Sequence, residues 1–158
     1  MSSSSEEVLF QGQKIAVGSD HAGYDLKESA LDFIVGQGAD AIDCGADSDA
    51  SCDYPVFAKK VADAILQGRA EKGVLICGSG VGMSIVANRF PGIRAALCFN
   101  ADMAKLARQH NDANILVMGA RLTHRDAALA MVERFFLTDF HEGRHSRRVA
   151  LIDDNNVA

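Results

Sequence analysis

A cysteine and three glycines lie together where an apolar run ends. In the stretch GVLICGSGVGMSIVANRF, Cys77 closes the run, and Gly78, Gly80 and Gly82 follow at alternate positions before a helical pattern begins. Glycine lets the main chain approach a ligand closely, and the N–H groups at the start of a helix attract negative charge. The same positive field favours the thiolate of Cys77. The loop therefore predicts an anion site beside a reactive thiol. On these residues alone, a tight turn beside a buried structural cysteine stays an open alternative.

Two well-known glycine motifs do not fit this loop. The dinucleotide fingerprint GxGxxG would need a glycine at Met83, and the nucleophile elbow GxSxG fails because glycines flank Ser79 directly. No two of the four cysteines have CxxC spacing, which argues against zinc and thioredoxin-like motifs. The loop is therefore interpreted as an anion site that does not belong to a nucleotide-binding or hydrolase motif.

The elements that must position this loop are visible as short apolar runs. Five such runs alternate with segments of helical spacing. This alternation predicts an α/β, Rossmann-like three-layer sandwich, in which a five-stranded parallel sheet has helices on both faces. An extra C-terminal helix is expected over Asp139–Leu151. The predicted strands are Lys14–Gly18, Asp40–Cys44, Gly73–Cys77, Ile93–Cys98 and Ile115–Gly119.

Two loops that follow predicted strands suggest the strand order. SDHAG, residues 19–23, follows the first strand, and the glycine loop, residues 77–82, follows the third. Ligands bind at the carboxyl ends of parallel strands, near the point where the chain order reverses. If both loops line one site, the first and third strands are neighbours, which favours the order 2-1-3-4-5.

Length and composition indicate one globular domain. The chain has 158 residues, of which 48% are apolar and 23% charged, and its net charge is −5. We therefore expect no nucleic-acid partner and no membrane partner. Residues 1–13 resemble an expression-tag remnant, since LFQG looks like part of a viral 3C-type protease site, and we leave them out of the predicted domain, residues 14–158. No secretory signal is visible, which predicts a cytoplasmic protein with reduced cysteines.

Five blocks of the sequence resemble one known family. SDHAGYDLK, DYPVFA, GVLICGSGVGMSIVANRFPGIRAALC, ARQHNDANILVMGAR and GRHSRRV are similar, in order and spacing, to ribose-5-phosphate isomerase type B. That enzyme belongs to the sugar-phosphate isomerase family that also includes galactose-6-phosphate isomerase subunits. The similarity runs from about Lys14 to Ile152. It implies isomerisation of an aldose phosphate to a ketose phosphate through a cis-enediolate, with no metal and no cofactor.

The resemblance also implies roles for individual residues. Cys77 is expected to be the base, because the family branch that uses a glutamate instead would place it at Met83, which cannot take a proton. His110, in the RQHN block, is expected to open the sugar ring, since an imidazole both donates and accepts protons near neutral pH. The expected substrate-binding residues are Asp20, His21, Tyr54, Gly78, Ser79, Gly80, Gly82 and Asn111, and the expected phosphate-binding residues are His21, Arg121, Arg144 and Arg148.

Several of these residues also have plain structural interpretations. Asp20 lies where a helix N-cap is expected, and Tyr54 fits an aromatic residue at the edge of the core. Arg144 and Arg148 are four residues apart and so share a helix face, which is typical of a solvated charged surface as well as of a phosphate site.

The position of His110 predicts an oligomer. His110 ends the helix after the fourth strand, and such a helix runs antiparallel to the strands, so His110 should lie at the amino edge of the sheet. The glycine loop should lie at the carboxyl edge. We therefore expect His110 and Asn111 to reach the site of a second copy, in a homodimer that catalysis requires. The resemblance also implies a homodimer, sometimes paired into a tetramer, and the same geometry allows Arg144 and Arg148 to act across the interface.

Three other functions stay open at this point. The substrate could be another sugar phosphate, either a six-carbon one such as allose or galactose 6-phosphate, or a four-carbon erythrulose phosphate. A non-catalytic phosphosugar-binding module would keep the glycine loop and the arginines but would not need Cys77 or His110. A thiol-dependent hydrolase or redox enzyme would need a base, usually a histidine, close to the Cys77 thiol in the same chain.

Overall fold

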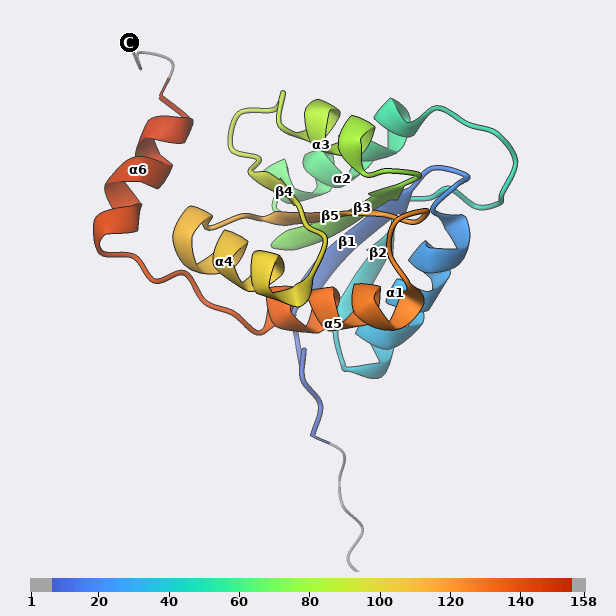
Figure 1. The fold of residues 1–158 in the computed structure, drawn as a ribbon, viewed down its shortest axis with the longest axis horizontal. Helices are drawn as coiled ribbons and strands as arrows, with labels where there is room; N and C mark the ends of the chain where they lie inside the picture. Colours follow the sequence, from blue (N-terminus) through green and yellow to red (C-terminus); the bar gives the residue numbers. More distant parts are fainter. Residues whose placement is uncertain (1–6, 155–158) are drawn as a thin grey trace, which may run out of the picture.

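A computed structural model describes residues 7–154 of the chain (Figure 1). The strands are β1 (Lys14–Ser19), β2 (Asp40–Asp43), β3 (Lys72–Cys77), β4 (Ala95–Leu97) and β5 (Ile115–Gly119). The helices are α1 (Tyr24–Gly36), α2 (Tyr54–Leu66), α3 (Val81–Ala87), α4 (Ala101–Asn111), α5 (Arg125–Phe136) and α6 (Arg144–Ile152). None of the helices in this range is both long enough and apolar enough to cross a membrane.

The predicted three-layer α/β fold is confirmed. The five strands form one parallel sheet, with α2 and α3 over one face and α1, α4 and α5 over the other (Figure 1). Because successive strand residues point to opposite faces, Leu75 and Cys77 of β3 join the core beneath α2 and α3, whereas Val74 and Ile76 join the core beneath α1 and α5. The side chain of Cys77 therefore lies on the α2–α3 side of the sheet.

The strand order is β2-β1-β3-β5-β4, so the predicted order 2-1-3-4-5 is wrong in its last two places. The expected pairing of β1 with β3 is present. β5 lies next to β3 because every residue of its ILVMG segment is buried, whereas the short AAL segment of β4 is only half-buried and suits an edge. The stronger apolar character of ILVMG is the sequence signal for the more central strand.

Two asparagine side chains hold β4 at this edge. Asn88, at the end of α3, donates from its amide nitrogen to the carbonyl of Ala95 at 2.9 Å and accepts from the N–H of Ala95 at 2.8 Å. Asn114 donates to the carbonyl of Gly92 and accepts from the N–H of Arg94, both at 2.8 Å. These side-chain bonds satisfy main-chain groups that a short edge strand would leave unpaired, and they fix where β4 begins.

Helix α6 stands apart from the layers and contains no buried residue (Figure 1). It begins at Arg144, later than the predicted Asp139, because Glu142 and Gly143 have positive φ angles of 55° and 56° that a helix does not allow. Near its other end, the Asp153 carboxylate accepts from the guanidinium of Arg94 and from the N–H of Gly92, each at 3.1 Å. The helix is thus tied to the domain near its C-terminal end, and its residues stay at least partly exposed.

Part of the segment that was interpreted as a tag remnant packs against the core in the structure. Phe10 is 0% exposed, and its ring centroid lies 5.7 Å from that of Phe33 in α1 and 5.8 Å from that of Phe136 in α5. The N–H of Phe10 donates to the carbonyl of Gln37 at 2.8 Å. Phe10 therefore closes the core between the ends of α1 and α5.

Candidate active site

The carboxyl edge of the sheet gathers one group of predicted site residues. The ends of β1, β3 and β5 are adjacent here. Main-chain bonds tie the loops that follow them, from the N–H of Asp20 to the carbonyl of Ile76 at 3.2 Å and from the N–H of Arg121 to the carbonyl of Gly78 at 2.9 Å. We call these residues the carboxyl-edge group; they are Asp20, His21, Tyr54, Cys77, Gly78, Ser79, Gly80, Gly82 and Arg121.

The sulfur of Cys77 receives a hydrogen bond from the glycine loop. The N–H of Gly80 donates to the Cys77 Sγ at 3.2 Å, so the sulfur lies directly against the main chain of the loop. Only 4% of Cys77 is exposed. Two surface hollows, of about 520 and 300 Å³, are lined by other residues. In the single chain Cys77 is therefore almost entirely buried, and neither of these hollows opens onto it.

Each glycine of the loop makes room for a close neighbour. A Cβ added at Gly78 would lie 3.1 Å from Nη1 of Arg121, and one added at Gly82 would lie 2.7 Å from the ring of Tyr54. Gly80 has a φ of 80°, which L side chains rarely adopt, and a Cβ there would meet other atoms at 2.5 Å. The loop thus brings a guanidinium and a phenol ring against the main chain that carries the amides.

Asp20 and Ser79 support the turns that begin two helices. The buried carboxylate of Asp20 accepts from the N–H of Gly23 at 3.1 Å, but the N-cap of α1 is Gly23, so Asp20 is a turn residue before the helix and not its N-cap. The hydroxyl of Ser79 accepts from the N–H of Val81 at 3.3 Å at the start of α3. Both oxygen groups have further acceptor capacity that a sugar hydroxyl could use.

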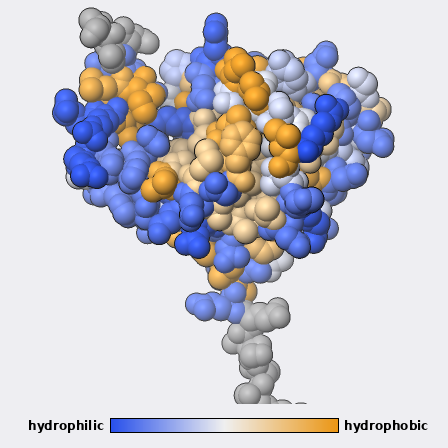
Figure 2. Space-filling view, viewed as in Figure 1, coloured by the Kyte–Doolittle hydropathy of each residue, from blue (hydrophilic) through white to orange (hydrophobic). Residues whose placement is uncertain are grey.

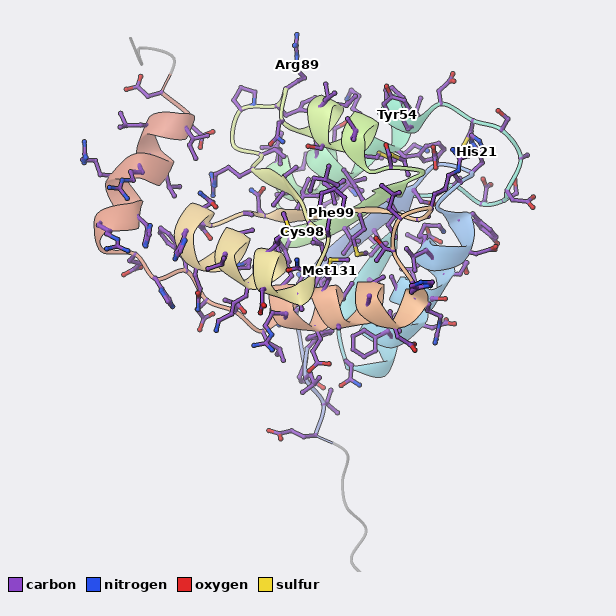
Figure 3. All side chains as sticks on the ribbon, in the orientation of Figure 1. His21, Tyr54, Arg89, Cys98, Phe99 and Met131 are labelled. Atoms are coloured by element: carbon purple, nitrogen blue, oxygen red, sulfur yellow. The ribbon has the colours of Figure 1, made fainter. Side chains whose placement is uncertain are left out.

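His21 contacts a residue that the sequence analysis did not select. The N–H of Cys52 donates to Nδ1 of His21 at 3.2 Å, and the Cys52 Sγ lies 3.9 Å from the same nitrogen. Figure 3 labels His21, in the loop after β1, and Tyr54, at the start of α2. A thiol–imidazole pair is therefore present, but its thiol is Cys52, whereas Cys77 is bonded to the glycine loop. The sequence signal for Cys52 is its place two residues before Tyr54 of the DYPVFA block.

The remaining predicted residues form a second group, where the end of α4 meets the start of α6. His110 and Asn111 close α4, and Arg144 and Arg148 are exposed on α6. The ring of His110 stacks on that of His145, with centroids 4.4 Å apart and planes 13° apart. We call these residues the α4–α6 group. His145 was not predicted; its signal is its position inside the GRHSRRV block.

The α4–α6 group is crowded with positive charge. Partial withdrawal from water and then the charges of His110, Arg144, Arg148 and His141 lower the pKa of His145 from its ordinary value of 6.5. All the side chains that lower this pKa are arginines or histidines. A phosphate bound among them would reduce the repulsion between their positive charges.

The structure places the two groups at opposite edges of the sheet. α4 begins after the carboxyl end of β4 and ends before β5 begins. Its 11 residues span about 16 Å at the rise of an α-helix, and His110 lies in its last turn. A single chain therefore keeps the Cys77 thiol and the His110 imidazole apart.

The fold and the carboxyl-edge group define a three-layer α/β protein with a glycine loop at the carboxyl edge of its parallel sheet. The model of the Ribose/Galactose Isomerase family matches residues 15–152. Ribose-5-phosphate isomerase B of Escherichia coli (strain K12) is 43% identical over 140 residues, which cover 89% of this chain and 94% of that protein. Ribose-5-phosphate isomerase B of Mycobacterium tuberculosis (strain H37Rv) is 38% identical over 143 residues, which cover 89% and 88%. The crystal structure of a ribose 5-phosphate isomerase from Thermotoga maritima is 51% identical, covers 89% of this chain and 97% of its own, and superposes with a TM-score of 0.88.

The chain belongs to the ribose/galactose isomerase family, and it is a sugar-phosphate isomerase. The family predicted from the five sequence blocks is confirmed.

Proposed function

We propose that the chain interconverts ribose 5-phosphate and ribulose 5-phosphate without a metal, with Cys77 as the base. The observation that carries this proposal is the bond from the Gly80 N–H to the Cys77 sulfur at 3.2 Å, within a loop that presents main-chain amides. The choice of a five-carbon substrate is supported by the names of the relatives from E. coli and M. tuberculosis.

In this proposal the Cys77 thiolate takes the proton from the carbon beside the carbonyl group. The electron pair of that C–H bond forms the carbon–carbon double bond, and the carbonyl oxygen becomes the oxyanion of a cis-enediolate. The hydroxyl proton on the carbon that lost its hydrogen passes to this oxyanion as the new carbonyl group forms there, and the thiol returns its own proton to the former carbonyl carbon. Amides of the glycine loop face the developing negative charge, and each such donor typically contributes about 100- to 1,000-fold in kcat.

The other residues of the carboxyl-edge group hold the sugar phosphate in this proposal. Asp20, Tyr54 and Ser79 supply hydrogen bonds to sugar hydroxyls. The guanidinium of Arg121 lies against Gly78, so it binds the phosphate in the same chain as the base. His21 also contributes to the phosphate site.

A second copy of the chain supplies the α4–α6 group, in a homodimer that could pair further into a tetramer. Apolar side chains gather over α3, β4 and α4 (Figure 2), and β4 pairs with β5 alone, which leaves its other edge open. A patch of this kind marks a protein interface, and a copy seated on it would bring its His110, Asn111, Arg144 and Arg148 to the glycine loop. The exposed residues of this patch are Val81, Ile85, Phe99, Met103 and Leu106.

Steady-state assays of three proteins test the proposal, each in the presence of a metal chelator. Wild type should turn over ribose 5-phosphate with the chelator present. Cys77→Ala should lose nearly all activity on any substrate, and His110→Ala should lose activity on the cyclic sugar while keeping more of it on an open-chain ketose phosphate. Wild-type turnover by Cys77→Ala would remove the assigned base and favour a non-catalytic or differently organised site.

Comparison of four-, five- and six-carbon phosphates in the same assay tests the choice of substrate. The proposal expects the highest kcat/KM for the five-carbon pair. A higher value for erythrulose phosphate, or for allose or galactose 6-phosphate, would reassign the substrate within the same chemistry.

The proposed chemistry also favours a reducing compartment such as the cytoplasm. The base has to remain a thiol, and Cys44, Cys52, Cys77 and Cys98 are all free.

A further inference from the structure

The structure assigns to the main-chain N–H of Cys52 the task of fixing the tautomer of His21, so that His21 presents Nε2–H as a donor to the substrate. Cys52 is a positioning residue in this inference, because it acts through His21. Where the inference concerns substrate, it rests on the proposed function.

The hydrogen bond itself decides which ring nitrogen carries the proton. A main-chain N–H only donates, so its partner at 3.2 Å, Nδ1 of His21, must offer a lone pair. The proton of a neutral His21 ring is then on Nε2. The Cys52 Sγ, 3.9 Å from Nδ1, can add only a weak S–H donor to the same lone pair and so favours the same tautomer.

Both partners of this bond are held in place by main-chain contacts. The loop of residues 44–53 is bonded to the end of β1, from the N–H of Ser19 to the carbonyl of Gly45 and from the N–H of Ala46 to the carbonyl of Ser19, each at 2.7 Å. At its other end the loop runs into α2 at Tyr54. His21 follows β1 by two residues. The bond from Cys52 therefore joins two segments that the same strand end already aligns.

A fixed Nε2–H suits a ligand that accepts hydrogen bonds. Phosphate and sugar oxygens accept from a donor, whereas a ring free to exchange tautomers would present a lone pair to them part of the time. With Nδ1 engaged by Cys52, the ring also has no second nitrogen with which to act as a base. His21 is thus a binding donor, and proton abstraction is left to Cys77.

Histidine ¹⁵N NMR of the unliganded protein tests the tautomer without any assay of activity. In a ¹⁵N-histidine-labelled sample at a pH where the ring is neutral, His21 should show a protonated Nε2 and an unprotonated Nδ1, with assignment by His21→Gln. Cys52→Ala, which keeps the N–H and removes the thiol, should show the same tautomer. An Nδ1–H tautomer or a rapid mixture in wild type would overturn the inference, whether or not the protein is an isomerase.

Removing the main-chain N–H of residue 52 tests whether the tautomer of His21 affects substrate binding. Cys52→Pro has no N–H at this position and should convert His21 to a tautomer mixture. If His21 binds the phosphate, the variant should also raise KM for ribose 5-phosphate by roughly 3- to 10-fold, the worth of one hydrogen bond, with a smaller change in kcat. Ser51→Pro places the same ring one residue earlier in the exposed loop while keeping the Cys52 N–H, and should leave tautomer and KM near wild type.

Further measurements distinguish the tautomer of His21, the role of Cys52 and the isomerase activity from one another. Titration with inorganic phosphate should shift the Nε2 resonance of His21 more than the Nδ1 resonance. An unchanged tautomer in a folded Cys52→Pro protein would overturn the role of Cys52. If the tautomer changes but no sugar phosphate is converted by wild type, the proposed function fails and the tautomer assignment stands. Should Cys52→Pro not fold, the spectra of wild type and Cys52→Ala still decide the tautomer.

Discussion

At Gly80 the geometry of a single residue controls the position of the amide that faces Cys77. Its φ of 80° allows the loop to turn back, so that the N–H reaches the Cys77 sulfur at 3.2 Å. A Cβ would approach Leu97 Cδ1 to 2.5 Å and the main-chain carbon of Met118 to 3.0 Å. Met118 lies in a central strand, so this contact cannot be relieved by turning a flexible side chain.

Gly80→Ala should therefore lower both stability and turnover. We expect a loss of about 1–3 kcal/mol in the free energy of unfolding from backbone strain, measured by urea denaturation, and a fall in kcat larger than any change in KM, because the amide moves away from the sulfur. Gly36→Ala is the matched control: Gly36 lies in helix α1 with nothing within 4 Å of an added Cβ, and alanine there should be neutral or stabilising by up to about 1 kcal/mol. Equal stability of the two variants would contradict the strain argument.

The stacked histidines make a second prediction at the residue scale. Partial burial and nearby positive charges lower the pKa of His145 from 6.5; the charges are those of His110, Arg144, Arg148 and His141. The folded protein therefore favours the neutral form of the His145 ring. The contact between α4 and α6 is then favoured above about pH 6.5 and weakened as the pH falls. NMR titration of His145 should give a midpoint below 6.5, and His110→Ala should move it upward. A midpoint at or above 6.5 in wild type would show that the rings are not held together as described.

At the scale of elements, the apolar surface that a strand can bury determines whether it lies in the centre of the sheet or at its edge. β5 is fully buried and lies between β3 and β4, whereas β4 depends on side-chain bonds from Asn88 and Asn114. The leader contributes to the same balance, because Phe10 fills the space between Phe33 and Phe136.

Phe10→Ala should destabilise the domain by about 3–5 kcal/mol, the usual cost of truncating a buried aromatic side chain. Val8→Ala is the control, since Val8 is 46% exposed and should cost less than about 1 kcal/mol. Thermal or urea unfolding of both variants measures the difference. A cost for Phe10→Ala as small as that of Val8→Ala would mean that residues 7–13 add little to the fold.

At the scale of the whole molecule, the separation of the two groups makes a prediction about mixtures. Cys77→Ala lacks the proposed base but keeps His110, and His110→Ala has the opposite defect. If the site is built from two chains, refolding the two variants together at equal amounts should give half mixed dimers, each with one site that is intact for the cyclic sugar. Activity should then recover to about a quarter of wild type.

The same experiment excludes the alternative arrangement. If Cys77 and His110 served one site within a single chain, every site in the mixture would lack one of them and no activity would return. Mixing the two variants without refolding is the control, since activity should then rise only as fast as subunits exchange. An Ile85→Asp change in the apolar patch, with Ile85 60% exposed, should also abolish recovery by preventing association.

The sequence alone was sufficient for the element types, the glycine loop at the end of β3, and the family. Strand and helix periodicity and the choice of glycine at alternate positions are local properties, and they can be read along the chain without knowing what lies opposite. The five blocks also contain every predicted residue of the two groups, but they did not single out His145 and did not show how the two groups are related in space.

Only the tertiary structure decided which distant segments meet. Four features depend on contacts between segments that are distant in the sequence. They are the order of β4 and β5, the burial of Phe10, the stacking of His145 on His110 and the bond from Cys52 to His21. His21 and Cys52 are 31 residues apart, and no local pattern selects that pair. Such contacts depend on the sum of packing and hydrogen bonding over the whole domain, which the folded chain resolves and a linear pattern does not contain.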